Sequence, residues 1–303
     1  MTSYAIRNIF NDWNPYREHF VRITKEHIVM EPRVKGPKPL KVDLHLHTAE
    51  DPNDRVSYTA KELISKAADQ GFEVLAITNH QCLTFNLKLS DYARERGILL
   101  IPGMEINLHH RHVLFLNPPS AKKVSDFSSL AALRRPDRLI MAPHPYFPNP
   151  RSLNGYLLKN IKVFDAIEYC HFYSHQINFN QKAVRVSRLH GLPLVGNSDT
   201  HFLPQLGTTY SLIYAEKEPE AIFEAIRHKR VEIVSRPLSH LEMGTFLGGF
   251  LGMKLPARKT NPLDQSGSRT RAKRFRLPIP FRGVPLSLLV SLSSYFGEKF
   301  NHL

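Results

Sequence analysis

The feature of this sequence that most constrains its fold is an alternation of short apolar strands with amphipathic helices, which begins near Lys41. The first unit reads KVDLHLH and is followed by the capping box Thr59-x-x-Glu62 and the helical run ELISKAADQG. In a capping box the two side chains satisfy backbone N–H groups at the start of a helix. The pattern therefore marks a strand, a turn and a helix, and its repetition predicts an α/β protein with a parallel sheet.

The alternation continues to about residue 236. Further strands are predicted at EVLAIT, ILLIPG, HVLFL, RLIMAP, DAIEYC, PLVGN, TYSLIYA and VEIVS, and helices near 84–96, 126–134, 153–160, 176–190 and 219–229. No G-x-G-x-x-G or G-x-x-x-x-G-K-[ST] motif follows the first strand, so the signatures of open nucleotide-binding sheets are missing. We therefore predict that the sheet closes into a β/α barrel.

Three segments are expected. Residues 1–40 are predicted to be a polar, helical lead-in, residues 41–236 the barrel, and residues 237–303 a Gly-rich turn, a basic linker and a short apolar C-terminal segment. The 303-residue chain has a formal charge of +14, and from Lys254 onward ten basic residues face only two acidic ones. Such a segment can contact nucleic acid or an anionic membrane surface. A binding protein that works through residues 254–303, with the barrel as scaffold, is therefore the alternative function.

The sequence also predicts a cytoplasmic location. It contains two cysteines, which excludes a disulfide framework, and its N-terminal region has no apolar segment typical of a secretory signal. No apolar run reaches the length of about 18 residues that a membrane span needs.

Histidines and carboxylates follow the predicted strands at the points where the strands end. The carboxyl ends of barrel strands open onto one face, so these side chains should converge there. Imidazole together with carboxylate suits Zn²⁺, Mn²⁺ or Fe²⁺, and ions about 3.5–4 Å apart can activate a water for phosphoryl displacement. The residues concerned are His45, His47, His80, Glu105, His112, His144, Asp199 and His201.

These residues lie in motifs that resemble the polymerase and histidinol phosphatase (PHP) superfamily of metal-dependent phosphoesterases. The resemblance spans residues 41 to about 235. It rests on the motifs Asp43-Leu-His45-Leu-His47-Thr48, Leu75-Ala-Ile-Thr-Asn79-His80, Pro102-Gly-Met-Glu105-Ile, His112-Val-Leu, Ala142-Pro-His144-Pro and Gly196-Asn-Ser-Asp199-Thr-His201.

The resemblance implies a distorted, TIM-like barrel of seven strands that holds two or three divalent metal ions, Mn, Zn or Fe. The implied activity is hydrolysis of a phosphomonoester, a nucleotide or an oligonucleotide end by a metal-activated water, with Glu105, His144 and Asp199 in catalytic roles. Asp51 and Glu50 compete with Asp54 for one ligand position, and His110 competes with His112 for another. The implied ligands are His45, His47, Asp54, His80, Glu105, His112, His144, Asp199 and His201.

One motif departs from the family, which usually has Thr-Asp-His where this chain has Thr-Asn79-His80. If position 79 orients a ligand histidine, the uncharged amide makes that ligand less basic. Arg55 and Arg151 lie in predicted loops and are the candidates for binding a substrate phosphate. The remaining histidines beside predicted helices, such as His171 and His190, are expected at the surface.

Overall fold

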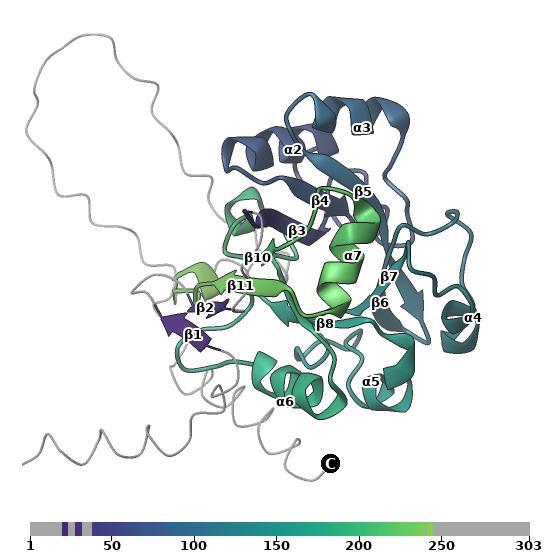
Figure 1. Ribbon diagram of the computed structural model, residues 1–303, viewed down its shortest axis with the longest axis vertical. Helices are drawn as coiled ribbons and strands as arrows, with labels where there is room; N and C mark the ends of the chain where they lie inside the picture. Colours follow the sequence, from purple (N-terminus) through teal and green to yellow (C-terminus); the bar gives the residue numbers. More distant parts are fainter. Residues whose placement is uncertain (1–19, 24–27, 32–37, 240, 245–303) are drawn as a thin grey trace, which may run out of the picture. The chain divides into compact units, whose positions relative to one another are not determined.

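The computed structural model describes the chain except for residues 1–19, 24–27, 32–37, 240 and 245–303 (Figure 1). The described part contains eleven strands in one sheet. The strands are β1 (Phe20–Ile23), β2 (Ile28–Glu31), β3 (Leu40–Leu46), β4 (Val74–Ile77), β5 (Leu99–Leu108), β6 (Arg111–Leu116), β7 (Leu139–Ala142), β8 (Ala166–Cys170), β9 (Leu194–Asn197), β10 (Thr209–Ile213) and β11 (Val231–Ser235).

Six α-helices connect these strands within the described residues, together with two short 3-10 helices. The α-helices are α2 (Ala60–Asp69), α3 (Leu87–Arg94), α4 (Phe127–Ala132), α5 (Gly155–Lys159), α6 (Asn180–His190) and α7 (Pro219–Arg227), and the 3-10 helices are η1 (Ile161–Val163) and η2 (Leu203–Gln205). The predicted capping box is confirmed, because the Thr59 side chain accepts from the backbone of Glu62 while Glu62 accepts from the backbone of Thr59.

The order of strands is β1-β2-β11-β10-β3-β4-β5-β6-β7-β8-β9. The pairs β3/β4, β4/β5, β7/β8 and β8/β9 are parallel, as predicted, but β6 and β10 run antiparallel to both of their neighbours. His109 and His110, both with positive φ, form a two-residue turn between β5 and β6. A turn this short joins only antiparallel strands, which is why the prediction of a purely parallel sheet was wrong here.

The nine strands β3 to β11 form a nearly closed barrel, so the implied count of seven strands is not confirmed. The seam lies where β9 meets β10 and β11. There the Ser211 hydroxyl accepts from the Gly196 N–H at 2.9 Å and donates to the Gly196 carbonyl at 3.0 Å. A Cβ on Gly196 would come within 2.6 Å of Ile233, so only glycine allows the strands to approach this closely.

The barrel interior is apolar and is filled from one end by α7, which crosses the middle of the view in Figure 1. Ile222, Phe223 and Ile226 of α7 pack in one buried cluster with residues of eight strands, among them Val42 and Leu114. A second apolar layer lies between the sheet and helices α4 to α6, and a third lies under α2 and α3. Burial of these faces is what holds the helices on the sheet.

The lead-in differs from its prediction. The two parts of residues 1–37 that the structure describes are the strands β1 and β2, not helices, and β2 pairs with β11. The basic linker and the apolar segment predicted within residues 237–303 fall outside the described residues. No helix in the described ranges combines the length and the apolar character needed to cross a membrane.

Candidate metal centre

The predicted site residues do meet at one end of the barrel, where the parallel strands finish. A register shift between Asp43 and Leu46 interrupts the regular alternation of β3. As a result Leu44 lies in the barrel interior, whereas Leu46 packs under α2. The shift leaves His45 and His47 pointing together into the mouth of the barrel, where both are fully buried.

Four acceptor atoms converge at this mouth. Nε2 of His45 lies 3.2 Å from Nε2 of His47, 3.4 Å from Oε2 of Glu105 and 3.2 Å from Oδ1 of Asp199. Nε2 of His47 lies 3.3 Å from the same Glu105 oxygen and 3.4 Å from the same Asp199 oxygen. Ligand atoms that bind one ion at 2.0–2.1 Å in tetrahedral geometry lie about 3.3–3.4 Å from one another. The ligand atoms of His45, His47 and Glu105 lie close enough together to hold one divalent cation, and Asp199 belongs to a second such group with His45 and His144.

The other ring nitrogens of these histidines are held by carboxylates. Nδ1 of His45 lies 2.9 Å from Oε1 of Glu168, and Nδ1 of His47 lies 2.9 Å from Oδ2 of Asp51. An Nδ1–H that donates to a carboxylate leaves the Nε2 lone pair free for a metal. The four converging atoms are then all lone-pair donors, an arrangement that is unfavourable without a cation or added protons between them.

Asp51 orients two histidines at once. The oxygen that accepts from His47 also accepts from Nδ1 of His80 at 2.9 Å and from the His80 backbone N–H at 2.8 Å. Its second oxygen accepts from the backbone N–H groups of Asn53 and Asp54. Nε2 of His80 thereby faces Oε2 of Glu105 at 3.0 Å. Asp51 is thus a hydrogen-bonded support of the centre.

Glu105 uses both of its oxygens. Oε2 belongs to the converging set, and Oε1 lies 2.7 Å from Nδ1 of His112 and 3.3 Å from Nε2 of His144. The Ser152 hydroxyl donates to the His144 carbonyl and so can accept from Nδ1 of His144. Nε2 of His112 is buried and has no hydrogen-bond partner within the described residues. A carboxylate with ring nitrogens around both oxygens can bridge two ions.

A further pair completes the group. Oδ2 of Asp54 lies 2.9 Å from Nε2 of His201, whose Nδ1 donates to the Asp199 carbonyl at 3.0 Å. The lone pair of that Nε2 again faces a carboxylate oxygen. Asp54, and not Asp51, is therefore the acid that presents an oxygen beside His201, although both lie within reach of His47 and His80.

Burial and neighbouring opposite charges shift the pKa values of these groups in opposite directions. Burial lowers the pKa of His45, but the carboxylates of Asp199, Glu168 and Glu105 outweigh it and raise that pKa well above its usual range. The pKa of His80 is raised to about 9, because Glu105 and Asp51 outweigh its burial. Burial raises the pKa of Glu105, yet the surrounding histidines hold it well below its usual range. The Glu105 carboxylate is thus ionised and ready to bind a cation.

Two residues of the centre have an unusual backbone conformation. His144 has a φ of +27° and Asp199 a φ of +45°, values that cost roughly 1–3 kcal/mol for residues other than glycine. Asp43 holds the loop before Asp199 in place, because its carboxylate accepts from the Ser198 hydroxyl at 2.6 Å and from the Ser198 backbone. Burial raises the pKa of Asp43 to about 7.

His112, His110 and Asn79 lie in different surroundings. His112 is buried beside Glu105, whereas His110 is exposed in the β5–β6 turn. The Asn79 amide accepts from the Thr48 N–H at 2.9 Å and donates to the hydroxyls of Thr48 and Thr84. It contacts neither ring of the neighbouring histidines. The change from aspartate therefore leaves the orientation of those ligands to Asp51.

The other residues considered in the sequence analysis lie in different environments. Arg55 and Arg151 are exposed, and no contact between either guanidinium and the centre is present in the described part of the chain. His171 was predicted at the surface, but it is buried and its Nε2 accepts from the Gln205 amide at 3.2 Å. Glu168, which supports His45, was not assigned a definite role from sequence. Its place at the end of the strand DAIEYC was the only signal for it.

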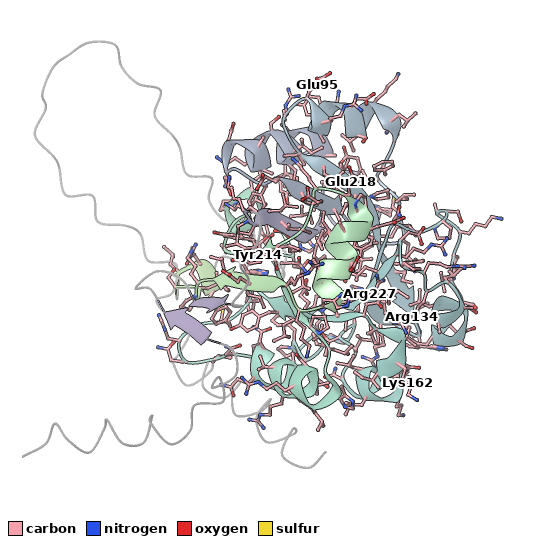
Figure 2. The ribbon with its side chains drawn as sticks, in the orientation of Figure 1. Glu95, Arg134, Lys162, Tyr214, Glu218 and Arg227 are labelled. Carbon is pink, nitrogen blue, oxygen red and sulfur yellow. The ribbon has the colours of Figure 1, made fainter. Side chains whose placement is uncertain are left out.

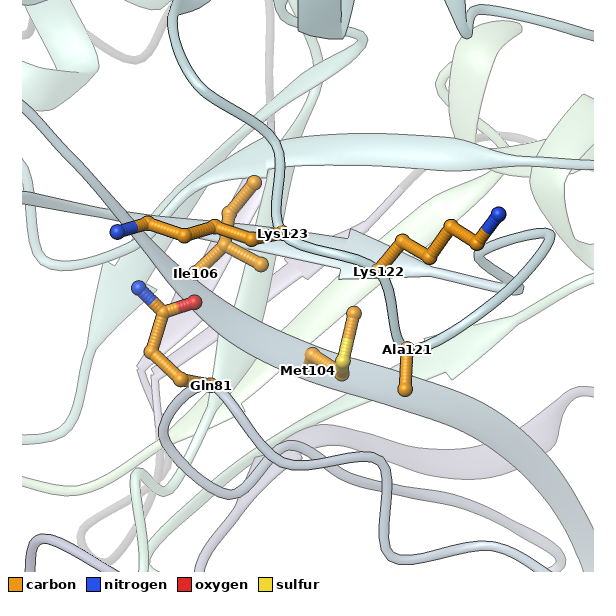
Figure 3. Close-up of a pocket in the computed structure, with 6 residues that line it drawn as sticks. All are labelled: Gln81, Met104, Ile106, Ala121, Lys122 and Lys123. Atoms are coloured by element: carbon orange, nitrogen blue, oxygen red, sulfur yellow. The ribbon is translucent and has the colours of Figure 1, made fainter.

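A small pocket lies beside β5 (Figure 3). Gln81 follows His80 in the chain, and Met104 and Ile106 flank Glu105, so the strand that carries Glu105 forms part of the pocket wall. Its volume is about 280 Å³, close to the lower limit of about 300 Å³ for ligand pockets. The remaining lining residues are Ala121, Lys122 and Lys123.

Comparisons with known proteins agree with this geometry. A family model described as the PHP domain matches residues 43–190, and one described as PHP-associated matches residues 178–231. An uncharacterized protein of Methanocaldococcus jannaschii, MJ1587, is 26% identical over 149 residues, which cover 42% of this chain and 82% of that protein.

Two solved structures are similar in fold. PsfC from Pseudomonas syringae superposes with a TM-score of 0.49 at 16% identity, over 72% of this chain and 98% of PsfC. The lesion-specific endonuclease PfuEndoQ from Pyrococcus furiosus superposes with a TM-score of 0.47, also at 16% identity, over 62% of this chain and 56% of that one.

Proposed function

Because the chain belongs to the PHP family, we propose that it is a metal-dependent phosphoesterase that hydrolyses a phosphomonoester, a nucleotide or the end of an oligonucleotide. The observation that carries this proposal is the position of Nε2 of His45 and Nε2 of His47, each of which lies 3.2–3.4 Å from both Oε2 of Glu105 and Oδ1 of Asp199. Ring nitrogens and carboxylate oxygens this close together are typical ligands of a divalent cation.

We assign two or three divalent ions to the centre. Ring nitrogens with carboxylates favour zinc, manganese or iron over magnesium. Glu105 has ring nitrogens around both oxygens and is the residue suited to bridging two ions. The proposed ligands are His45, His47, Asp54, His80, Glu105, His112, His144, Asp199 and His201.

Bound ions supply a nucleophile at neutral pH and stabilise the charge that develops on the phosphoryl oxygens. The protein holds the ligands in one arrangement through Glu168 and Asp51, which fix the tautomers of three histidines. Glu105, His144 and Asp199 line the converging set and are the proposed catalytic residues. Burial of the ligands reduces the screening of their charges by water.

Substrate phosphate is proposed to contact Arg55 and Arg151. Arg55 directly follows Asp54, and the backbone carbonyl of Arg151 accepts from the His112 N–H at 2.9 Å. Both guanidinium groups are exposed next to the site and are free to turn toward a ligand. Their replacement by glutamine should raise KM for a phosphoester more than it lowers kcat.

The test is a comparison of metal content and turnover in matched variants. Protein purified without chelator is analysed for Mn, Fe and Zn, and the same preparation is assayed for phosphate release from phosphomonoesters, nucleotides and short oligonucleotides. His45→Ala should lose both metal and turnover, whereas His190→Ala, which removes an exposed histidine of α6, should lose neither. Full metal content and turnover in His45→Ala would overturn the proposal.

A further inference from the structure

Charged residues are unevenly distributed at the barrel end opposite the metal centre. This end holds the starts of β4, β5, β7, β8 and β11, because all of them run in the direction of β3. Three of its loops, residues 133–138, 159–165 and 227–230, carry eight basic side chains and two acidic ones. We call these three loops the basic rim.

The basic rim is one connected surface although its loops are far apart in sequence. Arg134 donates to the Lys162 carbonyl at 2.8 Å and pairs with Asp165 at 2.7 Å. Arg227, at the end of α7, pairs with the same Asp165 oxygen at 3.3 Å and donates to the carbonyls of Pro136 and Arg135. Arg134, Lys162 and Arg227 lie on the same side of the molecule in Figure 2.

These hydrogen bonds and ion pairs involve only some of the basic side chains of the basic rim. Asp165 is buried beneath the rim and is already paired with two arginines. Four further cations, Arg135, Lys159, Lys162 and Lys229, are exposed, and their side chains form no ion pair within the described residues. Crowded like charges repel one another and add nothing to the fold, so such a surface is typical of a site for a polyanion.

Three other loops at the same barrel end have the opposite charge. Residues 69–73, 95–97 and 214–220, which we call the acidic rim, carry six acidic side chains and two basic ones. The Lys217 ammonium donates to the Gly97 carbonyl, which joins two of these loops, and the Leu99 N–H donates to the Glu73 carbonyl at 2.8 Å. Glu95 and Glu218 lie toward the top of Figure 2, away from Arg134 and Lys162.

The separation of the basic rim from the acidic rim indicates which kind of partner can bind at this end of the barrel. A flat anionic membrane would cover both rims, and the acidic rim would repel it. A nucleic-acid strand is narrow enough to follow the basic rim alone, and its phosphates form a dense line of negative charge. We propose that the basic rim binds the phosphate backbone of a nucleic acid, at the end of the barrel opposite the metal centre. Contacts of this kind hold a strand without reading its sequence.

The experiment measures binding by the full chain in EDTA, so that its outcome does not depend on the proposed hydrolysis. The probe is a fluorescein-labelled single-stranded DNA of about 16 nucleotides, followed by anisotropy between about 50 and 200 mM salt. The rim variant carries Arg135→Glu, Lys162→Glu and Lys229→Glu. The matched control carries Lys61→Glu, Lys66→Glu and Lys88→Glu on α2 and α3, which changes the net charge by the same amount.

The rim variant should bind at least about tenfold more weakly, and the magnitude of its log–log salt slope should fall by about 2, or about 0.7 for each lost phosphate contact. The control should lose less than about threefold. Equal losses in both variants, or no loss in the rim variant, would overturn the proposal. The proposal would also be overturned if the rim variant lost binding to phosphatidylserine vesicles but kept its binding to DNA. If the rim variant fails to fold, the same three positions changed to glutamine replace it.

Discussion

Oε1 of Glu168 lies 2.9 Å from Nδ1 of His45, on the side of the ring that faces away from the converging ligand atoms. The same oxygen accepts from the Asn197 amide at 3.0 Å, and Oε2 accepts from the His144 backbone N–H at 2.7 Å. One buried carboxylate from β8 therefore fixes a ligand of β3 and the backbone of a ligand that follows β7.

Glu168→Gln should weaken metal binding by about 10- to 100-fold, the usual effect of losing a partner of this kind. Glutamine has one acceptor oxygen, whereas Glu168 accepts three hydrogen bonds through two. The measurement is a competition titration against a fluorescent chelator. Glu224→Gln, on the exposed side of α7, is the control and should bind metal normally. Unchanged affinity in Glu168→Gln would show that His45 needs no such support.

Asp51→Asn and Asp54→Asn should differ in effect. Asp51 accepts from Nδ1 of both His47 and His80, so its loss should lower the affinity for every ion by about 10- to 100-fold. Asp54 faces His201 alone at short distance, so its loss should remove one ion and leave the others. Elemental analysis of both variants measures this. The assignment fails if Asp51→Asn loses one ion while Asp54→Asn weakens all of them.

Chelation should lower the melting temperature of the protein. Removal of the ions leaves the buried ligand atoms of His45, His47, Glu105 and Asp199 facing one another without a cation. A ligand at about 100 times its Kd stabilises a fold by about 2.7 kcal/mol, an effect that is lost on its removal. Calorimetry with EDTA, and again after Zn²⁺ or Mn²⁺ is restored, measures the shift. A melting temperature that does not respond to either step contradicts a metal-bound native state.

The ion pair between Arg236 and Glu242 predicts a pH dependence of stability. The guanidinium lies 2.6 and 3.1 Å from the two carboxylate oxygens and, with Ser239, holds the pKa of Glu242 at about 2. Because the folded-state pKa is lower than the usual value of 4.5, the stabilisation is present above pH 4.5 and is lost as the pH falls toward 2. This partly exposed pair should contribute about 0.5–1 kcal/mol.

Urea unfolding of Glu242→Gln and of wild type, at pH 7 and at about pH 3, tests this. The difference between the two proteins should be present at pH 7 and smaller at the acidic pH. Glu216→Gln, an exposed position after β10, serves as control. A difference that stays constant with pH would mean that the carboxylate charge of Glu242 contributes nothing.

Gly196→Ala should destabilise the barrel by about 1–3 kcal/mol, the usual cost of forcing a methyl group into a packed core. Its Cβ would meet Ile233 at 2.6 Å and the Tyr210 carbonyl at 3.0 Å, at the seam where β9 meets β10 and β11. Gly155→Ala is the matched control, because a Cβ there meets nothing within 4 Å. Chemical denaturation of both variants gives the two values, and equal stabilities would show that the seam can move apart at little cost.

The convergence of the site residues could be predicted because it follows from topology alone. His45, His80 and His144 each come at the end of a strand that runs in the same direction, so their meeting needs no knowledge of side-chain contacts. Their supports could not be predicted in this way. Whether Glu168 or Asp51 faces a ligand or its far side depends on the rotation of a ring, which the sequence pattern does not specify.

Strand direction was predicted less well for a related reason. Alternating strands and helices imply parallel pairs, but β6 follows β5 after only His109 and His110, and that turn reverses the chain. The lead-in strand β2 pairs with β11, about two hundred residues away in the chain. Local composition contains no signal for a pairing over such a distance, so a polar segment was assigned as helix.

The packing of α7 inside the barrel has a consequence for the proposed phosphoesterase activity. Ile222, Phe223 and Ile226 fill the space between the strands, so the barrel is a blind cup and not a tunnel. In the proposed reaction, substrate would therefore arrive, and product would leave, through the mouth that holds the histidines. Product would have to leave before the next substrate could enter. The rate of product release would therefore set an upper limit on the rate of turnover.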